Sequence, residues 1–266
     1  MSPENQSLTI VCPVFNEAEV IEYFYESLSG TLQILNNEFS IKILFVVDKS
    51  TDNSYEILSD ISLKDTRVQV LGLSTRFGHQ MSLVAGIDHS DSDIVIMMDS
   101  DLQHPPSLIP ELIDQYKKGY EVVFTIRKEP KDSSVLKRTG SKLFYKIMSW
   151  MAEVPLSSGQ ADYRLISRNV ANVFKNQIRE RNQFLRGLFS WVGFKRIGVE
   201  FSPDERLHGS SKYSFTTKVD LPDDLDELDE DLSAEEYEMY AEEVVDQASA
   251  AATIPELEAE ILSLTD

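Results

Sequence analysis

The sequence IVIMMDSDLQHPP, residues 94–106, decides the fold that we expect for this chain. Five apolar residues are followed at once by Asp99 and Asp101, and then by two prolines. An apolar run bounded by charge is typical of a strand buried on both faces of a parallel sheet, which presents functional side chains at its carboxyl end. The Asp-x-Asp is therefore a candidate site for a hard divalent cation. The two aspartates could equally be turn and N-cap residues before a helix that starts at the prolines.

Apolar strands and amphipathic helices alternate through the first half of the chain. This order predicts an α/β fold with a parallel sheet and right-handed crossovers, and a ligand at the carboxyl edge of the strands. Three polar clusters should meet at that edge, at residues 16–17, 48–52 and 99–101. We expect strands at 8–14, 40–47, 68–73, 94–98 and 121–126, and helices at about 20–35, 55–62 and 79–89.

The acidic charge is concentrated at the end of the chain. The sequence has 45 acidic and 25 basic residues, and 18 of the acidic residues but none of the basic ones lie in 219–266. The remaining 27 acidic and 25 basic residues nearly balance, so no basic excess favours nucleic-acid binding. We expect one domain at 1–218. An acidic tail that is helical or partly disordered should follow at 219–266, either as a replaced or fused terminus or as a solvated extension.

Cysteine usage and hydropathy bear on the compartment. The single cysteine, Cys12, excludes an intramolecular disulfide and indicates a reducing environment. No basic-then-apolar leader and no apolar window of about 20 residues is present, so we expect no membrane-spanning segment. Residues 141–152, SKLFYKIMSWMA, form an amphipathic pattern that fits either a helix lying in a membrane interface or an ordinary core-facing helix.

Six motifs in order carry a family resemblance: CPVFNEAE, VVDKSTDNS, TRFGHQMSLVAG, MMDSDLQHPPSLIPEL, GQADYRLISR and RLHGSSKYSF. Over residues 7–215 the chain resembles the family 2 glycosyltransferases with the GT-A fold, a mostly parallel, Rossmann-like sheet flanked by helices. More narrowly, it resembles the dolichol-phosphate mannose synthases and bactoprenol glucosyltransferases. The resemblance implies metal-dependent, inverting transfer of a hexose from a nucleotide sugar of the GDP-mannose or UDP-glucose type to a polyprenyl phosphate. That reaction would take place at the cytoplasmic face of a membrane.

The resemblance also assigns residues to the donor. Asp99 and Asp101 would hold Mg²⁺ or Mn²⁺ with the diphosphate, and Gln103 would lie near the diphosphate or the donor sugar. The family usually has two adjacent aspartates and a glycine where this chain has Val47, Asp48 and Lys49, so nucleoside recognition departs from the pattern. The residues expected to line the nucleoside pocket are Pro13, Phe15 and Glu17, with Asp48 reaching the base or ribose.

Basic residues are candidates for binding phosphate. Arg76 lies beside the expected start of a helix, where an anion is favoured, although it could instead pair with surface carboxylates. Arg127 and Arg138 belong to the most basic local stretch and could grip an acceptor phosphate bidentately. The last motif resembles a mobile loop that closes over the diphosphate, in which Arg206 and Lys212 would donate to phosphate oxygens beside Ser211.

Asp162 resembles the aspartate that faces the reaction centre in this family. A phosphate acceptor is already largely ionised at neutral pH, because its second pKa is near 6, so Asp162 would orient the donor or acceptor and need not act as a strong base. Pairing with Arg164 is the structural alternative. Two other functions stay open: a nucleotide-sugar-binding module without turnover, and a transferase to a saccharide acceptor. A peripheral position on a membrane and an oligomer are compatible with either transferase.

Overall fold

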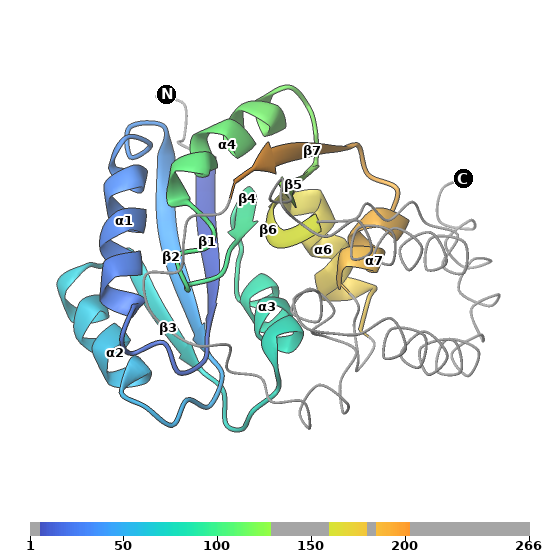
Figure 1. Ribbon diagram of the computed structural model, residues 1–266. Helices are drawn as coiled ribbons and strands as arrows, with labels where there is room; N and C mark the ends of the chain where they lie inside the picture. The colour runs from blue at the N-terminus through green and yellow to red at the C-terminus, as the bar shows by residue number, and fades with distance from the viewer. Residues whose placement is uncertain (1–5, 129–159, 180–184, 203–266) are drawn as a thin grey trace, which may run out of the picture.

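A computed structural model describes residues 6–128, 160–179 and 185–202. Within these residues the chain forms one seven-stranded sheet in the order β3-β2-β1-β4-β6-β5-β7, with helices on both faces (Figure 1). The strands are β1 (Gln6–Val14), β2 (Phe39–Val47), β3 (Val68–Gly72), β4 (Ile94–Met97), β5 (Val122–Arg127), β6 (Gln160–Ser167) and β7 (Arg196–Phe201). The helices are α1 (Ile21–Gln33), α2 (Ser54–Lys64), α3 (His79–Asp88), the 3₁₀ turn η1 (Pro106–Leu108), α4 (Ile109–Lys117), α6 (Arg168–Asn176) and α7 (Leu185–Trp191).

The expected α/β architecture is confirmed, and two apolar cores explain it. One core lies between the sheet and α1, α2 and α4, and the other lies between the sheet and α3, α6 and α7. Alternate residues of β1 enter opposite cores, with Ile10 in the first and Val11 in the second. Because both faces are covered, the central strands consist of continuous apolar runs, which is why their positions could be predicted from sequence.

Helix α3 packs unusually close to the central strand. A Cβ atom built on Gly86 would lie 2.1 Å from Val11 Cγ1, so any side chain at this position would displace the helix from β1. This close approach holds the last turn of α3 against β1, and the helix begins at His79, which lies 3.5 Å from Asp99 after β4.

Strand β6 differs from the expected parallel arrangement. It runs antiparallel to both neighbours, β4 and β5, whereas the other neighbouring strands are parallel. Met97 of β4 pairs with Arg164 of β6. Extending this register two residues past Met97 in β4 and two residues back from Arg164 in β6 puts Asp99 opposite Asp162. The antiparallel strand therefore brings the GQADYRLISR motif to the end of the MMDSDLQHPP motif.

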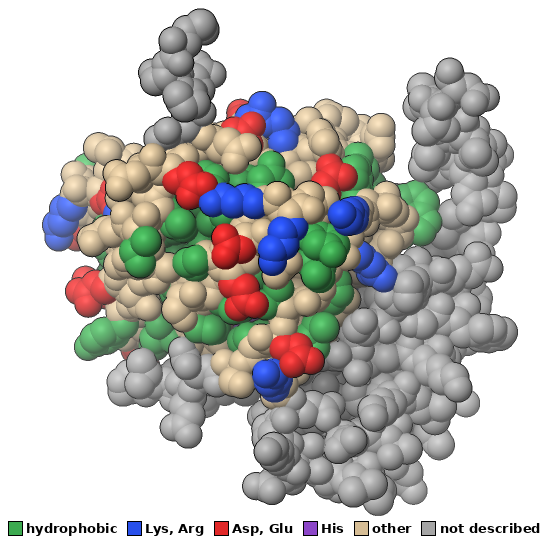
Figure 2. All heavy atoms as spheres, turned by 90° about the horizontal axis from the view of Figure 1, so that it is seen from above, with side chains coloured by type: hydrophobic (Ala, Val, Ile, Leu, Met, Phe, Trp, Pro, Cys, Tyr) green, Lys and Arg blue, Asp and Glu red, His purple; other side chains and the backbone are tan. Residues whose placement is uncertain are grey.

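The surface at the amino ends of the parallel strands differs from the edge at their carboxyl ends, where the polar motifs lie. Figure 2 views the molecule from the side on which α4 lies in Figure 1, and acidic and basic side chains are intermingled there with apolar ones. Ion pairs at this end include Arg168 with Asp93, at 3.0 Å, and Lys117 with Glu38. None of the helices in the described part of the chain is long and apolar enough to cross a membrane.

Candidate functional site

The loops after β1 and β2 are joined by side-chain hydrogen bonds. The carboxylate of Asp52 accepts the backbone N–H of Ala18 at 3.0 Å, and Ser54 Oγ accepts that of Glu17 at 2.9 Å. Asn16, which adopts a positive φ of 54°, accepts the N–H of Thr51 at 2.8 Å through its side-chain oxygen. Polar residues that the sequence placed at a common edge therefore build one connected wall of the site.

Asp48 supports the loop that leads into α3. Its two carboxylate oxygens accept the backbone N–H groups of Phe77, at 2.7 Å, and Gly78, at 2.9 Å, and its side chain is buried. Gly78 has a φ of 86°, a left-handed conformation that suits glycine. The expected contact of Asp48 with a base or ribose stays a prediction, and any such contact would add to this loop-holding role.

Two of the expected donor-binding side chains stack on each other. The Arg76 guanidinium carbon lies 4.3 Å from the centre of the Phe15 ring, within the range of a cation–π contact. Pro13, also assigned to the nucleoside pocket, is buried in β1, and its carbonyl accepts a hydrogen bond of 2.9 Å from Ser100 Oγ. These contacts connect the β1 end, the β4 end and the loop before α3.

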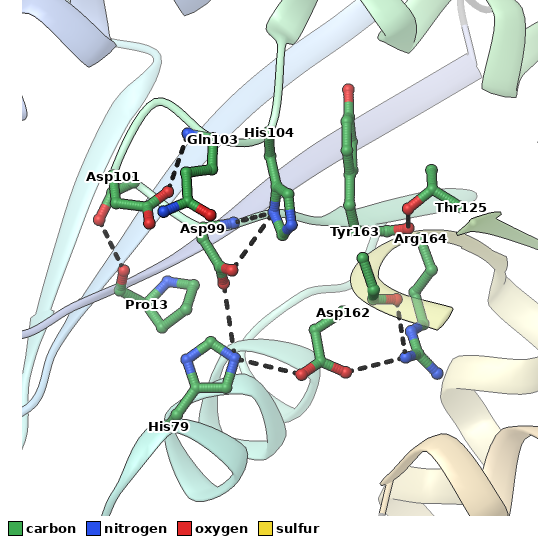
Figure 3. A network of polar contacts seen from close by, with 12 residues as sticks. Pro13, His79, Asp99, Asp101, Gln103, His104, Thr125, Asp162, Tyr163 and Arg164 are labelled. Atoms are coloured by element: carbon green, nitrogen blue, oxygen red, sulfur yellow. Dashed lines mark hydrogen bonds and ion pairs between the residues drawn. The ribbon is translucent and has the colours of Figure 1, made fainter. Parts of the chain in front are cut away.

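The aspartates after β4 lie in a tight turn (Figure 3). Asp101 Oδ1 accepts the backbone N–H of Gln103 at 3.0 Å, and His104 Nδ1 accepts that of Asp99 at 3.0 Å. The first bond agrees with the alternative reading of Asp101 as a turn residue. Because Nδ1 of His104 accepts the hydrogen bond from Asp99 N–H, its 3.4 Å approach to Asp99 Oδ2 is a contact between two acceptor atoms, and the ring stacks on Tyr163.

One oxygen of Asp99 faces His79 and has no hydrogen-bond partner among the described residues. Asp99 Oδ1 is buried, and among the described residues it has no hydrogen-bond partner; His79 Nε2 lies 3.5 Å away. A buried acceptor without a hydrogen bond is costly; the nearby His79 imidazole offsets part of that cost, and a ligand would offset the rest. This atom is the feature of the site that most favours a bound cation.

Gln103 and Arg127 are brought together. Arg127, at the end of β5, donates from Nη2 to Gln103 Oε1, and its side chain is exposed. The sequence assigned Gln103 to the donor and Arg127 to the acceptor phosphate. Their contact places those two candidates on the same side of the β4 turn.

Asp162 is buried and surrounded by the side chains of Arg186, Arg164 and His79. Arg186 donates to it from Nε and Nη2, at 3.1 and 2.9 Å, and Arg164 donates from Nη2 at 2.9 Å. Burial opposes ionisation of this carboxyl group. The Arg186 charge, a hydrogen bond with His79 and the Arg164 charge outweigh burial and hold the pKa of Asp162 well below its usual range. The pairing with Arg164 was foreseen, whereas Arg186 was missed.

His79 lies between two acidic side chains. Its Nε2 is 3.5 Å from Asp99 Oδ1 and 3.6 Å from Asp162 Oδ2 (Figure 3). Burial lowers the pKa of His79, but the Asp99 charge and the hydrogen bond and charge of Asp162 raise it to about 9. The first residue of α3 therefore carries a positive charge between the two motifs at neutral pH.

The sequence contains a signal for Arg186 but not for its partner. Arg186 lies in the apolar segment LRGLFSW, and an arginine in such a setting needs an acidic partner. Asp162 is 24 residues earlier, so only the packing of α7 on the sheet identifies it. Four assigned residues lie outside the described residues, namely Arg138, Arg206, Ser211 and Lys212. The segments 141–152 and 219–266 lie outside them as well.

The sequence model of the family described as glycosyl transferase family 2 matches residues 9–174 of the chain, more than half of its length. The chain belongs to this family. The match spans the strand ends that carry Asp48, Asp99, Asp101 and Asp162, and the resemblance found in the motifs is thereby confirmed.

Curated relatives include proteins with glycosyltransferase names. The chain is 39% identical over 213 residues to "Uncharacterized glycosyltransferase YkcC" of Bacillus subtilis, covering 80% of this chain and 65% of the relative. It is 33% identical over 207 residues to "Prophage bactoprenol glucosyl transferase homolog" of Escherichia coli, covering 78% and 67%. The chain thus spans about two thirds of the length of these family 2 proteins.

Solved structures confirm the GT-A fold. The mannosyltransferase PcManGT from Pyrobaculum calidifontis, solved with GDP-Man and Mn²⁺, has a TM-score of 0.56 at 13% identity. The match covers 59% of that chain and 79% of this one. Mannosyl-3-phosphoglycerate synthase from Rubrobacter xylanophilus gives 0.56 at 13% identity, with 75% of that chain and 95% of this one covered. At these identities the likeness concerns the fold alone.

Proposed function

We propose that this chain is a metal-dependent, inverting hexosyltransferase. It moves a hexose from a nucleotide sugar of the GDP-mannose or UDP-glucose type to a polyprenyl phosphate. Membership of family 2, with relatives named for bactoprenol glucosyl transfer, supports the reaction class. The single observation that carries the proposal is the open oxygen of Asp99 at the carboxyl end of β4. The enzyme would work as a peripheral protein at the cytoplasmic face of a membrane.

The residues after β4 fit Mg²⁺ or Mn²⁺. Asp99 and Asp101 offer hard oxygen ligands, and Asp99 Oδ1 is buried without a hydrogen-bond partner in the described part of the chain. Among the described residues no group of three or more His, Cys, Asp or Glu side chains could hold a metal ion. Two carboxylates with the remaining positions taken by substrate oxygens and water match a cation that binds together with a diphosphate. The bound cation would neutralise charge on the diphosphate.

The donor would lie along the loops that follow β1, β3 and β4. The stacked pair of Phe15 and Arg76 offers an aromatic face and a cation for the nucleotide. Gln103, held by Arg127 and by its backbone bond to Asp101, would contact the diphosphate or the sugar. Pro13 and Glu17 would complete the nucleoside side, with Asp48 in reach of the base or ribose.

The acceptor would approach from the side of Arg127, the described member of the expected phosphate-binding pair. A phosphate monoester needs little base assistance, since its second pKa is near 6. This agrees with the arginine contacts of Asp162, which hold that carboxylate ionised and weakly basic. Asp162 therefore orients other groups at the site and does not abstract a proton.

The test combines binding and turnover. Thermal shift with UDP and GDP, with and without Mn²⁺, should raise the melting temperature only when the metal and the preferred nucleotide are both present. Hexose transfer to undecaprenyl phosphate in detergent should then release the same nucleoside diphosphate. Donor binding without release of nucleoside diphosphate would favour a binding module. Transfer to sugars in place of the lipid phosphate would favour a saccharide-directed enzyme.

A further inference from the structure

Helix α7, which packs on the same face of the sheet as α3, contributes a buried arginine to the site. Arg186 is 8% exposed, and its Nε and Nη2 meet the two oxygens of Asp162 at 3.1 and 2.9 Å. Two parallel bonds between planar groups fix the orientation of a carboxylate as well as its charge. A lysine could supply the charge but not the paired geometry.

The other contacts of Asp162 pass this orientation on to α3. Asp162 Oδ2, which Arg186 Nη2 holds, also accepts from Gln80 Nε2 at 3.4 Å and lies 3.6 Å from His79 Nε2. The first turn of α3 is thus bound to a carboxylate whose plane is set by α7. If that plane rotated, both His79 and Gln80 would lose their partner.

The same imidazole then meets the first aspartate of the Asp-x-Asp. His79 Nε2 is 3.5 Å from Asp99 Oδ1, the oxygen that lacks a hydrogen bond in the described residues. We propose that Arg186 is a positioning residue of the transfer reaction, which fixes Asp162 so that His79 is held between Asp162 and Asp99 and the Asp99 carboxylate keeps its orientation toward the donor. This inference rests on the proposed function. It adds to that function a residue from a helix distant in sequence.

The alternative role for Arg186 is structural, since a buried ion pair between α7 and β6 could serve only to hold the helix on the sheet. The variant Arg186→Lys separates the two roles because it keeps a buried positive charge beside Asp162 and removes the paired guanidinium N–H donors. Arg164→Lys is the matched control. Arg164 contacts the same carboxylate and is also buried, and in the described contacts it meets Asp162 through one nitrogen, Nη2.

The experiment measures kcat and donor KM at saturating Mn²⁺, together with the melting temperature. Small displacements of reacting groups cost up to about 100-fold in rate, so we expect Arg186→Lys to lower kcat by at least about tenfold with donor KM and melting temperature little changed. Arg164→Lys should lose less than about threefold. Equal kcat losses in the two variants, or a wild-type kcat for Arg186→Lys, would overturn the proposal.

A double-mutant cycle tests the route through His79. If Arg186 acts by holding this side chain, adding Arg186→Lys to His79→Ala should cause no further loss of kcat. Losses that multiply would show that Arg186 acts by another route and would also overturn the proposal.

A separate readout covers the case in which the proposed function fails. If the wild-type protein binds Mn²⁺ with a nucleoside diphosphate but transfers nothing, the orientation of Asp99 is read from Mn²⁺ affinity, measured by the electron paramagnetic resonance of free Mn²⁺. Arg186→Lys should then weaken Mn²⁺ binding severalfold and Arg164→Lys should not. Unchanged affinity in both variants, or no Mn²⁺ binding by the wild-type protein, would reject the positioning role.

Discussion

Two acidic side chains at the end of the sheet have the His79 imidazole between them, and their other contacts differ. Asp162 on β6 is 6% exposed and is held by two arginines. Asp99 after β4 is 32% exposed, yet its Oδ1 is buried with no hydrogen bond from the described residues. The comparison teaches that a carboxylate whose oxygens are already used is suited to hold the protein together. A carboxylate with an open oxygen is suited to bind something else.

The largest effect on stability should come from replacing Asp162, whose two oxygens both accept hydrogen bonds from arginines. Asp162→Asn leaves Arg186 and Arg164 buried without their counter-charge, and breaking a buried pair in this way costs about 3–5 kcal/mol. Urea unfolding followed by circular dichroism should show this loss. Asp91→Asn is the control, since the Asp91 side chain is 96% exposed and solvent screens its pair with Lys175, so it should change stability little. A similar small change for both variants would mean that Asp162 is not what holds α7 on the sheet.

The open carboxylate should separate activity from stability. Asp99→Asn removes a cation ligand but breaks no hydrogen bond of Oδ1, so we expect at least about 100-fold lower transfer, about 3 kcal/mol of transition-state stabilisation. The free energy of unfolding without metal should fall by less than it does for Asp162→Asn, because Asp99 loses only its charge contact with His79 whereas Asp162 loses its contacts with two buried arginines. Initial rates and urea curves on the same preparation measure both. A variant that keeps the thermal shift of Mn²⁺ with nucleoside diphosphate would refute the metal role of Asp99.

For stability, the effect of replacing Asp48 should lie between the effects for Asp162 and Asp99, because both Asp48 oxygens accept hydrogen bonds from the loop before α3. Asp48→Asn replaces one acceptor by an N–H₂ group facing a backbone donor, and we expect a loss of about 1–3 kcal/mol in unfolding free energy. Asp60→Asn, on the exposed face of α2, is the control. A changed preference between UDP and GDP with unchanged stability would instead assign Asp48 to base recognition.

The smallest effect concerns an Arg–Asp pair outside the site. The side-chain hydrogen bonds of Arg67 lower the pKa of Asp65 to about 2, from 3.8. A carboxyl group with a lowered native pKa adds stability above its unfolded pKa and loses it as pH falls toward about 2. The difference in unfolding free energy between the wild type and Asp65→Asn should therefore be about 1–2 kcal/mol at pH 5 and shrink toward pH 2. A difference independent of pH would show that the pair acts through packing alone.

Local patterns predicted most of the first half of the fold. Strands expected at 8–14 and 40–47 are found at Gln6–Val14 and Phe39–Val47, because buried strands need continuous apolar residues whatever they pair with. The expected helix at 79–89 is found at His79–Asp88. The meeting of the clusters at 16–17 and 48–52 also follows from parallel strands ending at one edge, and the hydrogen bond from the Thr51 backbone N–H to Asn16 Oδ1 confirms it.

The antiparallel strand could not be predicted in the same way. Residues 160–167 include Asp162 and Arg164, which interrupt the apolar run that marks a buried strand, and from the sequence we treated them only as a motif after a glycine turn. In the structure every residue of β6 is buried, since the charged side chains neutralise one another and Arg186 completes the set. Pairing between residues distant in the chain depends on packing, which local periodicity does not encode.

By itself, the sequence determined the family, the strands that end in acidic residues and the chemistry of an oxygen-rich cation site, because these depend on residue type and local order. Only the tertiary structure decided which carboxylate has an oxygen without a hydrogen bond from the described residues and which has both oxygens bonded. Asp99 and Asp162 have the same functional group. Their different roles arise because β6 runs antiparallel beside β4 and α7 brings Arg186 to one of them and not to the other.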